Sequence, residues 1–514
     1  MKIKHFERIL LITMLGCAVY INTLVNGFVF DDFNFIVYND FIKNWKNIFV
    51  LLNPSYFFKV IPDIYGAARP VWLASLILDY SIWGLNPFGY HLTSLLFHLL
   101  NSVLVYFLIY KITKNIPLGF LSGLLFTVHP MHTEAVNVIS FRPDLMAAFF
   151  CLLGFIFYID SVNSQKRRDK IIYFLSANIF YVFAVLSKDM AITLPLLFVL
   201  YDYYFLAEGN FGKFYKRFKW HAGYLVLTTM FLLFRLPRFN YNVPTIVNTS
   251  IYSNITDNIF TMSTVFANYI KLLIVPVKLC ADYTCYPIFR SMVQPEVFIS
   301  IIVIIFSIFL GFFSFKKNKL VSFCIFWFFI ALIPVSNIIP LLNISAERYL
   351  YFPSIGFCVL LAVLINSPLS SLSKREEAKI GILLLFLILV FYSAITVTRN
   401  PVWADSYTLW SQTSAAYPNN VKARVNYAAA LYDNGDIDGA KKQYQEALKK
   451  YDELKSIVVC NMNMSVIHND LGVLYLQQEK FRKARESFEK GLKIAPKNPV
   501  LLKNLAYTNC LKNK

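Results

Sequence analysis

Apolar runs long enough to cross a membrane recur through the first 398 residues, and short loops rich in Lys and Arg separate them. The chain of 514 residues is 57% hydrophobic and 15% charged, whereas soluble globular chains are roughly half apolar and one-quarter charged. This composition excludes an ordinary cytosolic enzyme, a disordered protein, a secreted disulfide scaffold and a pure solenoid. A polytopic membrane protein with a soluble part remains.

About eleven segments are predicted to span the bilayer. They are residues 9–30, 87–112, 116–130, 143–160, 171–187, 189–206, 220–236, 296–315, 319–334, 349–366 and 379–398. The basic loops between them are expected in the cytoplasm, which puts the N-terminus inside and the C-terminus outside. The stretches 71–84 and 258–280 contain Asp79 and Lys271, so we expect them to lie at the outer surface instead of crossing.

The net charge of +19 would suggest a nucleic-acid partner in a soluble protein. Here much of the excess sits in the basic loops and no nucleic-acid motif accompanies it, so we expect membrane lipids and no nucleic acid as neighbours. The eight cysteines show no CxxC pair and no Cys/His cluster, which favours buried free thiols. Cys280–Cys285 and Cys460–Cys510 disulfides are the alternatives in an oxidising compartment.

After Arg399 the chain becomes polar, helical and repetitive. Small and aromatic residues follow the spacing of the tetratricopeptide (TPR) repeat, at Leu471, Gly472, Tyr475, Ala484, Phe488 and Pro496, with an upstream copy at Ala428, Leu431, Ala440, Tyr444 and Ala447. We predict repeats near 421–454 and 465–498, an insertion around 452–464 and a terminal helix over 499–512. The predicted division is a membrane domain over 1–398 and an extracytoplasmic TPR α-solenoid over 399–514.

Most of the unusual polar residues fall on the outer side once the loops are oriented. They are Asp31, Asp32, His91, His132, Glu134, Arg142, Asp144, Lys188, Glu347, Arg348 and Tyr349. Two adjacent carboxylates, Asp31 and Asp32, provide a candidate general base. Arg142, Lys188 and Arg348 are cations able to hold a phosphate, Arg bidentately and Lys as a point charge. A base and a phosphate clamp suit sugar transfer from a lipid phosphate to a hydroxyl group.

Each of these residue types also has a purely structural interpretation. The pair Asp31 and Asp32 could cap an interfacial helix, and Lys188 could be a lysine that reaches toward the interface from a helix end. Arg348 could form a structural pair with Glu347.

The histidines carry the same ambiguity. His91 shares a helical face with His98 and Asn101, which suits hydrogen bonds between helices as well as substrate contact. His129 and His132 suggest zinc, but no third ligand is evident, so we predict no metal site. The carboxylates would suit a hard divalent cation, although nearby cations could replace it.

Five stretches resemble one known family when they are taken in order with the TPR segment. They are GFVFDDFNFIVYND, NPFGYHLTSLLFHLLNSVLVY, HPMHTEAVNVISFRPDL, LSKDMAITLPLL and ISAERYLYFPSIGF. They resemble the transmembrane-and-TPR O-mannosyltransferases (the TMTC family) and their bacterial relatives, which are GT-C glycosyltransferases.

The resemblance implies an all-α GT-C bundle of about eleven spans and an inverting transfer from a lipid-phosphate sugar. It implies that the first outer loop, 29–86, carries the acidic pair with Asp31 as the base. Glu134 and Arg142 would belong to the second outer motif, and Glu347 and Arg348 to the late one.

We therefore predict a polyprenyl-phosphate-sugar-dependent glycosyltransferase of the O-mannosyltransferase type in a bacterial inner membrane. The donor would carry mannose or another hexose, and the TPR segment would hold a protein whose Ser or Thr accepts the sugar. The resemblance implies no required cofactor. One alternative is an envelope lipid or glycan acceptor, and another is a non-enzymatic membrane TPR scaffold.

Overall fold

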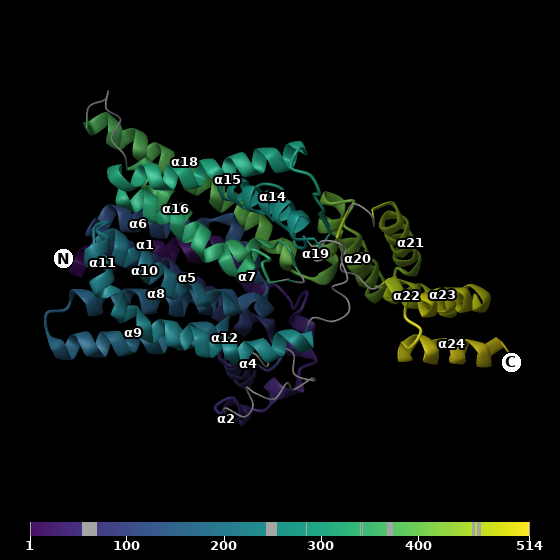
Figure 1. Ribbon diagram of the computed structural model, residues 1–514. Helices are drawn as coiled ribbons and strands as arrows, with labels where there is room; N and C mark the ends of the chain where they lie inside the picture. The colour runs from purple at the N-terminus through teal and green to yellow at the C-terminus, as the bar shows by residue number, and fades with distance from the viewer. Residues whose placement is uncertain are drawn as a thin grey trace.

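The computed structural model describes residues 2–53, 69–242, 254–283, 285–339, 341, 343–366, 374–454, 458–459 and 464–512. Helices in these residues form a bundle and a smaller C-terminal array that projects from one end of it (Figure 1). Extended structure in the described part amounts to one short antiparallel ladder, in which β1 (Tyr286–Pro287) pairs with β2 (Val458–Val459). The predicted all-α class is confirmed.

Each of the eleven predicted segments overlaps a helix of the bundle, although the bounds differ, most of all for the first, where the helix ends at Tyr20 and the prediction ran to residue 30. The helices are α1 (Lys2–Tyr20), α5 (Pro87–Thr113), α6 (Ile116–Val128), α8 (Arg142–Asn163), α9 (Arg167–Ser187), α10 (Leu194–Tyr201), α12 (Ala222–Asn242), α15 (Pro295–Lys317), α16 (Lys319–Leu332), α17 (Ser354–Ile365) and α18 (Lys374–Arg399). Among the described residues, 7 segments are long and apolar enough to cross a membrane, and the shorter helices α6, α12, α16 and α17 are apolar as well. The prediction of a polytopic membrane bundle is confirmed.

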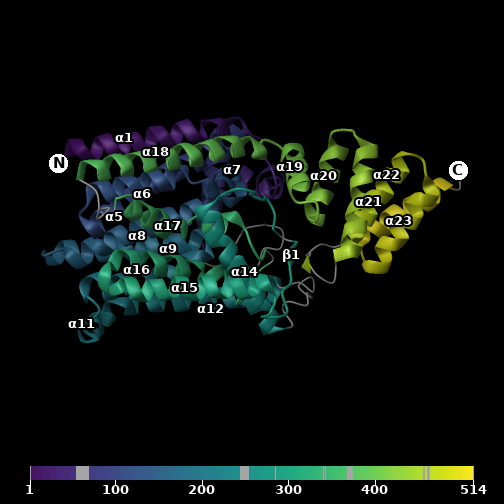
Figure 2. The same ribbon diagram turned by 90° about the horizontal axis from the view of Figure 1, so that it is seen from above.

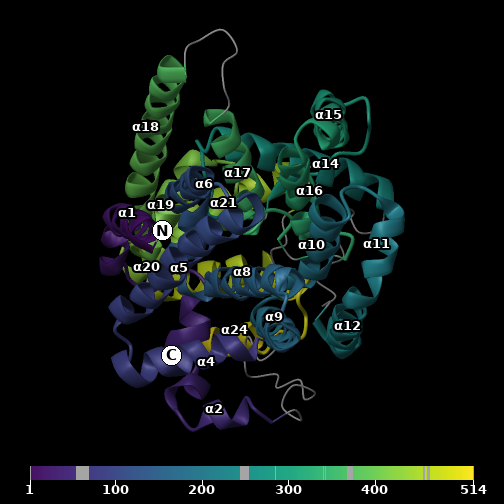
Figure 3. The same ribbon diagram turned by 90° about the vertical axis from the view of Figure 1, so that its left-hand side faces the viewer.

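Helices at the centre of the bundle differ from those at its edge. Seen along the bundle, α12, α15 and α18 lie at the periphery (Figure 3). Their apolar surface remains exposed. Only 17% of the apolar stretch of α15 is buried inside the protein, whereas 67% is buried in the segment that contains α8. Close packing inside the bundle requires glycine, because a Cβ at Gly119 of α6 would lie 2.8 Å from the Tyr106 carbonyl oxygen of α5.

Two further helices accompany the bundle but are not among the segments that are both long and apolar enough to span a membrane. α4 (Pro70–Trp83) packs against α5 and α9 and buries Trp72, Leu73 and Asp79. α14 (Ile255–Ile274) packs against α15. These two helices correspond to the stretches 71–84 and 258–280. Their position at the outer surface stays a prediction. Residues 54–68 of the predicted first loop lie outside the described residues.

The C-terminal array consists of helix pairs. Its helices are α19 (Ser406–Ala416), α20 (Val421–Asp433), α21 (Ile437–Leu454), α22 (Met464–Gln477), α23 (Phe481–Ile494) and α24 (Pro499–Lys512). The small residues Ala428 and Ala440 are buried between α20 and α21, and Ala484 and Phe488 are buried against α24. Part of the predicted insertion, 455–457 and 460–463, lies outside the described residues.

The array is attached to the bundle by a packed junction. α18 continues into the short helix η12 (Asn400–Trp403), and Trp403 and Trp410 share an apolar cluster with Val138 and Phe141 of the bundle. The Asn400 side chain accepts a hydrogen bond from Asn137 (2.9 Å). We propose a division into 1–398 and 399–514, although apolar and polar contacts cross the boundary.

Cysteine 285 adds a covalent link near β1. Cys285 is disulfide-bonded, whereas Cys280 and Cys510 are free. The two disulfides considered from the sequence are therefore wrong, and Cys460 lies outside the described residues. The N-terminus and the C-terminal array lie at opposite ends of the bundle (Figures 1 and 2).

Candidate active site

The Asp32 carboxylate holds the first outer loop in place through hydrogen bonds. Asp32 follows the short helix η1 (Ile21–Val25) and is fully buried. Its carboxylate accepts hydrogen bonds from the backbone N–H of Ser140 (2.6 Å) and of Val29 (3.2 Å). Burial raises the pKa of Asp32 to about 7, although these hydrogen bonds oppose the rise. Asp32 thus ties the first outer loop to the segment that precedes α8.

Asp31 has a different environment although it is the adjacent residue. It is partly exposed and lines a cavity of about 400 Å³. Burial raises the pKa of Asp31 above its usual range, while Lys422 and Arg348 act in the opposite direction. A carboxylate with a raised pKa and open access is the better candidate for a general base.

Arg348 and Glu134 form a buried pair above an aromatic ring. Glu134 belongs to α7 (Thr133–Asn137) and Arg348 to η11 (Glu347–Leu350). The Glu134 carboxylate accepts a hydrogen bond from the Arg348 backbone N–H (2.6 Å) and pairs with its guanidinium. The guanidinium carbon lies 3.9 Å from the centroid of the Phe141 ring. Arg348 is largely buried, with 7% of the residue exposed.

Lys188 is a second cation in the same region. It precedes the short helix η6 (Asp189–Thr193), and its ammonium group pairs with Asp144 of α8. Its nitrogen lies 5.7 Å from the centroid of the Tyr349 ring, and the Arg348 guanidinium carbon lies 5.1 Å from that centroid. Burial, together with the nearby Arg69 and Arg348, lowers the pKa of Lys188 to about 8 against the opposing effect of Asp144.

Arg142 lies in a separate structural cluster. Its guanidinium is fully buried and forms an ion pair with Asp79 of α4 (2.6 Å). It donates hydrogen bonds to Ser94 (3.1 Å), Ser75 (3.1 Å) and the Tyr90 carbonyl oxygen (2.8 Å). With each nitrogen engaged and no exposed surface, Arg142 connects α8 to α4 and α5. We therefore leave it out of the phosphate clamp that the sequence predicted.

Glu347 faces the junction with the C-terminal array. Its carboxylate accepts hydrogen bonds from the Cys280 backbone N–H (2.5 Å) and the Tyr283 hydroxyl (3.1 Å), and the Arg399 guanidinium lies 3.8 Å away. Burial raises the pKa of Glu347 to about 7, although Arg399 opposes the rise. Glu347 thus anchors the 275–290 segment and is not the partner of Arg348.

The sequence prediction missed four charged residues of this region. Arg69 and Arg399 flank Lys188 and Glu347, respectively. Asp282 and Lys422 form an ion pair of 2.7 Å between the bundle and α20. Lys422 sits in a helix whose remaining pattern indicated only a repeat, so no local signal distinguished it.

The histidines are used for packing. His91 lies within hydrogen-bonding distance of the Gly27 carbonyl oxygen (3.3 Å), and His132 within hydrogen-bonding distance of the Ser354 hydroxyl (2.8 Å). Burial lowers the pKa of His132 well below its usual value, so this ring is neutral. The described residues contain no group of three or more His, Cys, Asp or Glu that could hold a metal ion.

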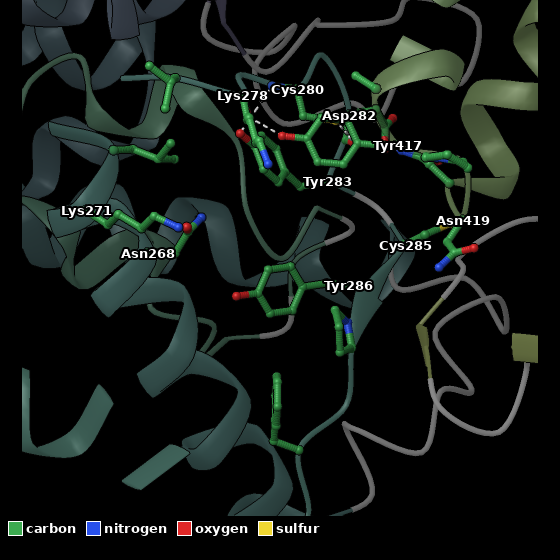
Figure 4. A pocket seen from close by; sticks show the side chains of 17 residues that line it. Asn268, Lys271, Lys278, Cys280, Asp282, Tyr283, Cys285, Tyr286, Tyr417 and Asn419 are labelled. Carbon is green, nitrogen blue, oxygen red and sulfur yellow. Dashed lines mark hydrogen bonds between the residues drawn. The ribbon is translucent and has the colours of Figure 1, made fainter. Parts of the chain in front are cut away.

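Two cavities flank the Asp282–Lys422 ion pair. The first is the cavity of about 400 Å³ lined by Asp31, Phe30, Trp410 and Lys422, which we call the Asp31 cavity. The second, of about 520 Å³, lies between α14, the 275–290 segment and the turn from α19 to α20. Figure 4 shows Lys271 and Asn268 on one side of this second cavity and Tyr417 and Asn419 on the other. We call it the tyrosine cavity, because Tyr283, Tyr286 and Tyr417 line it.

Two family models match separate parts of the chain. Residues 55–253 match the family model described as dolichyl-phosphate-mannose-protein mannosyltransferase, and residues 465–498 match the tetratricopeptide repeat. The chain is 26% identical to the human protein O-mannosyl-transferase TMTC3 over 533 residues, which covers 96% of this chain and 55% of that protein. It is 26% identical to human TMTC1 over 488 residues, covering 85% of this chain and 54% of that protein.

Among solved structures, the chain is similar to ArnT from Cupriavidus metallidurans bound to undecaprenyl phosphate, at 13% identity and a TM-score of 0.41, covering 95% of this chain and 79% of that one. The chain spans about half the length of the curated relatives it matches. The predicted resemblance to the TMTC proteins is confirmed over both the bundle and the TPR segment.

Proposed function

We propose that this TMTC-like chain is a GT-C membrane glycosyltransferase that moves a hexose, mannose in the first instance, from a polyprenyl phosphate to a Ser or Thr hydroxyl of an extracytoplasmic protein. One observation carries the proposal: the partly exposed carboxylate of Asp31 lines a cavity, and the Arg348 guanidinium acts to lower the pKa of that carboxyl. A base beside a phosphate-binding cation is what this reaction needs. The names of the similar O-mannosyl-transferases support the same reaction class.

The chemistry is a single displacement. The acceptor hydroxyl oxygen forms a bond to the anomeric carbon, the bond from that carbon to the phosphate oxygen breaks, and the polyprenyl phosphate leaves. The hydroxyl proton passes to the Asp31 carboxylate. Attack opposite the leaving group inverts the anomeric configuration. A raised pKa suits Asp31 for this role, because a base is most effective when its pKa approaches the working pH.

The leaving phosphate gains negative charge in this step, and we assign its stabilisation to Arg348 and Lys188. Their carboxylate partners, Glu134 and Asp144, fix the two cations in position. Each cation has further N–H donors for a phosphate oxygen, because a guanidinium has five and an ammonium group has three. Tyr349 lies between the two and helps to orient them.

We also propose a bacterial cytoplasmic membrane with the TPR array outside. The disulfide at Cys285 supports this side, because disulfides persist in oxidising compartments. The array would recruit the protein acceptor, since stacked helical repeats offer extended concave surfaces. An envelope glycan or lipid remains the alternative acceptor, and mass spectrometry of envelope proteins with and without the gene separates the two.

Substitution of the acidic pair tests the proposed base. We expect Asp31→Asn to lower kcat by roughly 10²–10⁴-fold in transfer from polyprenyl-phosphate mannose to a Ser/Thr-rich peptide, because the proton acceptor is lost. Asp32→Asn is the matched control: it should reduce thermal stability more than Asp31→Asn, because Asp32 accepts two backbone N–H groups. Full activity of Asp31→Asn would remove Asp31 as the base.

A further inference from the structure

The Asp31 cavity is built by both units of the molecule. The first outer loop contributes Phe30, Asp31 and Tyr38, and α19 and α20 contribute Trp410, Asn426 and Ala429. A volume of about 400 Å³ falls within the roughly 300–1,000 Å³ of pockets that bind small ligands. The cavity is large enough for a few residues of a polypeptide. Its lining residues lie at the junction between the bundle and the C-terminal array.

The α20 side of the cavity is one face of a helix. Lys422, Asn426, Ala429 and Asp433 line it, and their spacing of four, three and four residues puts them on the same face. Ala429 leaves room for a ligand beside the helix. The Asn426 amide can both donate and accept hydrogen bonds, which matches the alternating N–H and C=O groups of an extended polypeptide.

The opposite side is an aromatic wall held under backbone strain. Phe30 has a φ of +57°, a left-handed conformation that bulky side chains rarely adopt. Its ring stacks on Trp410 with centroids 5.3 Å apart, and it contacts Phe141 at 5.5 Å. Such strain persists where the surroundings fix it, as they do here, at the residue that directly precedes Asp31. Tyr38 is 70% exposed and completes the rim.

We propose that the Asp31 cavity is the acceptor subsite, where an extended polypeptide segment lies between the first outer loop and α20 and directs one Ser or Thr hydroxyl at Asp31. This inference rests on the proposed function and gives the TPR array a direct part in the active site. Of the described residues that line the cavity, none is Arg348 or Lys188. The donor phosphate and the acceptor chain would therefore contact different side chains around Asp31.

The tyrosine cavity provides an internal control. It is larger, at about 520 Å³, and lies at the same junction, but Asp31 does not line it. Ala416 lines the tyrosine cavity and Ala429 lines the Asp31 cavity. Ala416→Leu and Ala429→Leu therefore add the same bulk to neighbouring cavities. Leucine is a strong helix former, so both variants should fold.

The experiment measures binding of a fluorescent, unstructured Ser/Thr-rich peptide to the full-length chain in lipid nanodiscs. We expect Ala429→Leu to raise the peptide Kd about tenfold or more, because the added side chain fills the subsite, and Ala416→Leu to leave it at the wild-type value. Asn426→Ala adds no bulk and should raise the Kd by a smaller factor. In turnover, Ala429→Leu should raise the KM for the peptide and leave the KM for the donor unchanged.

Two results would overturn the subsite: no peptide binding by the wild-type chain, or an equal effect of Ala416→Leu and Ala429→Leu. Failure of the proposed base is a separate outcome. Retained transfer by Asp31→Asn would reject the catalytic role of Asp31. The peptide Kd values of Ala416→Leu and Ala429→Leu would still report on the subsite.

Discussion

Asp31 and Asp32 illustrate at the scale of single residues how neighbours in the sequence acquire separate roles. Asp32 accepts two backbone N–H groups and has no exposed surface. Asp31 is partly exposed and lines a cavity. Residue type and position are the same for both, and in the sequence only the family resemblance favoured Asp31 as the base. The burial and hydrogen bonding of each carboxylate favour Asp31 as the base independently, and Asp32 as a support of the loop.

The pH dependence of transfer should report Asp31 and Lys188. Asp31 acts when deprotonated, so activity should rise with pH through its raised pKa. Lys188 acts when protonated, and burial lowers its pKa to about 8, so activity should fall as the pH passes about 8. The expected profile of kcat/KM is a bell. Rates of the purified full-length chain between acidic and alkaline pH would measure it.

Lys188→Arg separates the two limbs of this profile. Arginine stays charged across the accessible range, so the variant should lose the alkaline fall while the acidic limb keeps its position. An unchanged alkaline limb in Lys188→Arg would show that another group titrates there, and the role of Lys188 at the donor phosphate would have to be abandoned.

The Arg142–Asp79 ion pair acts at the scale of elements, where it joins α8 to α4. Both partners are almost wholly buried, with 0% and 7% of their side chains exposed. Removing one partner of a buried pair leaves an uncompensated charge, which destabilises a protein by about 3–5 kcal/mol, whereas replacing both with apolar groups is often neutral. The pair should therefore matter for the packing of α4 and not for binding the donor.

A double substitution tests this assignment. We expect Arg142→Met to lower the thermal unfolding temperature of the detergent-solubilised chain, and Arg142→Met with Asp79→Leu to recover most of it. The double variant should retain transfer activity. A stable but inactive double variant would instead return Arg142 to the donor site, as the sequence suggested.

The same helices show which parts of the fold could be predicted from the sequence. Apolar periodicity and basic loops located the bundle helices, and the spacing around Ala484 and Phe488 located a repeat, because both signals are local. The partner of Arg142 could not be predicted, because Asp79 lies in another helix that is distant in the sequence. Lys422 was missed for the same reason: its partner, Asp282, belongs to the other unit.

At the scale of the whole molecule, the chain places its N-terminus far from its C-terminal array. The N-terminus lies at one end of the bundle and the TPR array at the other (Figures 1 and 2). Asp31 lies beside α20, so the proposed active site shares the array's side of the membrane. An extracytoplasmic acceptor requires this side to face outward, as the basic loops predict. Orientation is thus the condition on which the proposed base, subsite and acceptor all depend.

Cys510 offers a native probe of that orientation. It lies on α24 and is an exposed free thiol, while the other free cysteines in the described residues are buried or partly buried. If the array faces outward, a membrane-impermeant maleimide should label the wild-type chain in intact spheroplasts, and Cys510→Ser should lose that label. Labelling that appears only after the membrane is permeabilised would put the array in the cytosol. Asp31 would then face the cytosol as well, and an extracytoplasmic acceptor could not reach it.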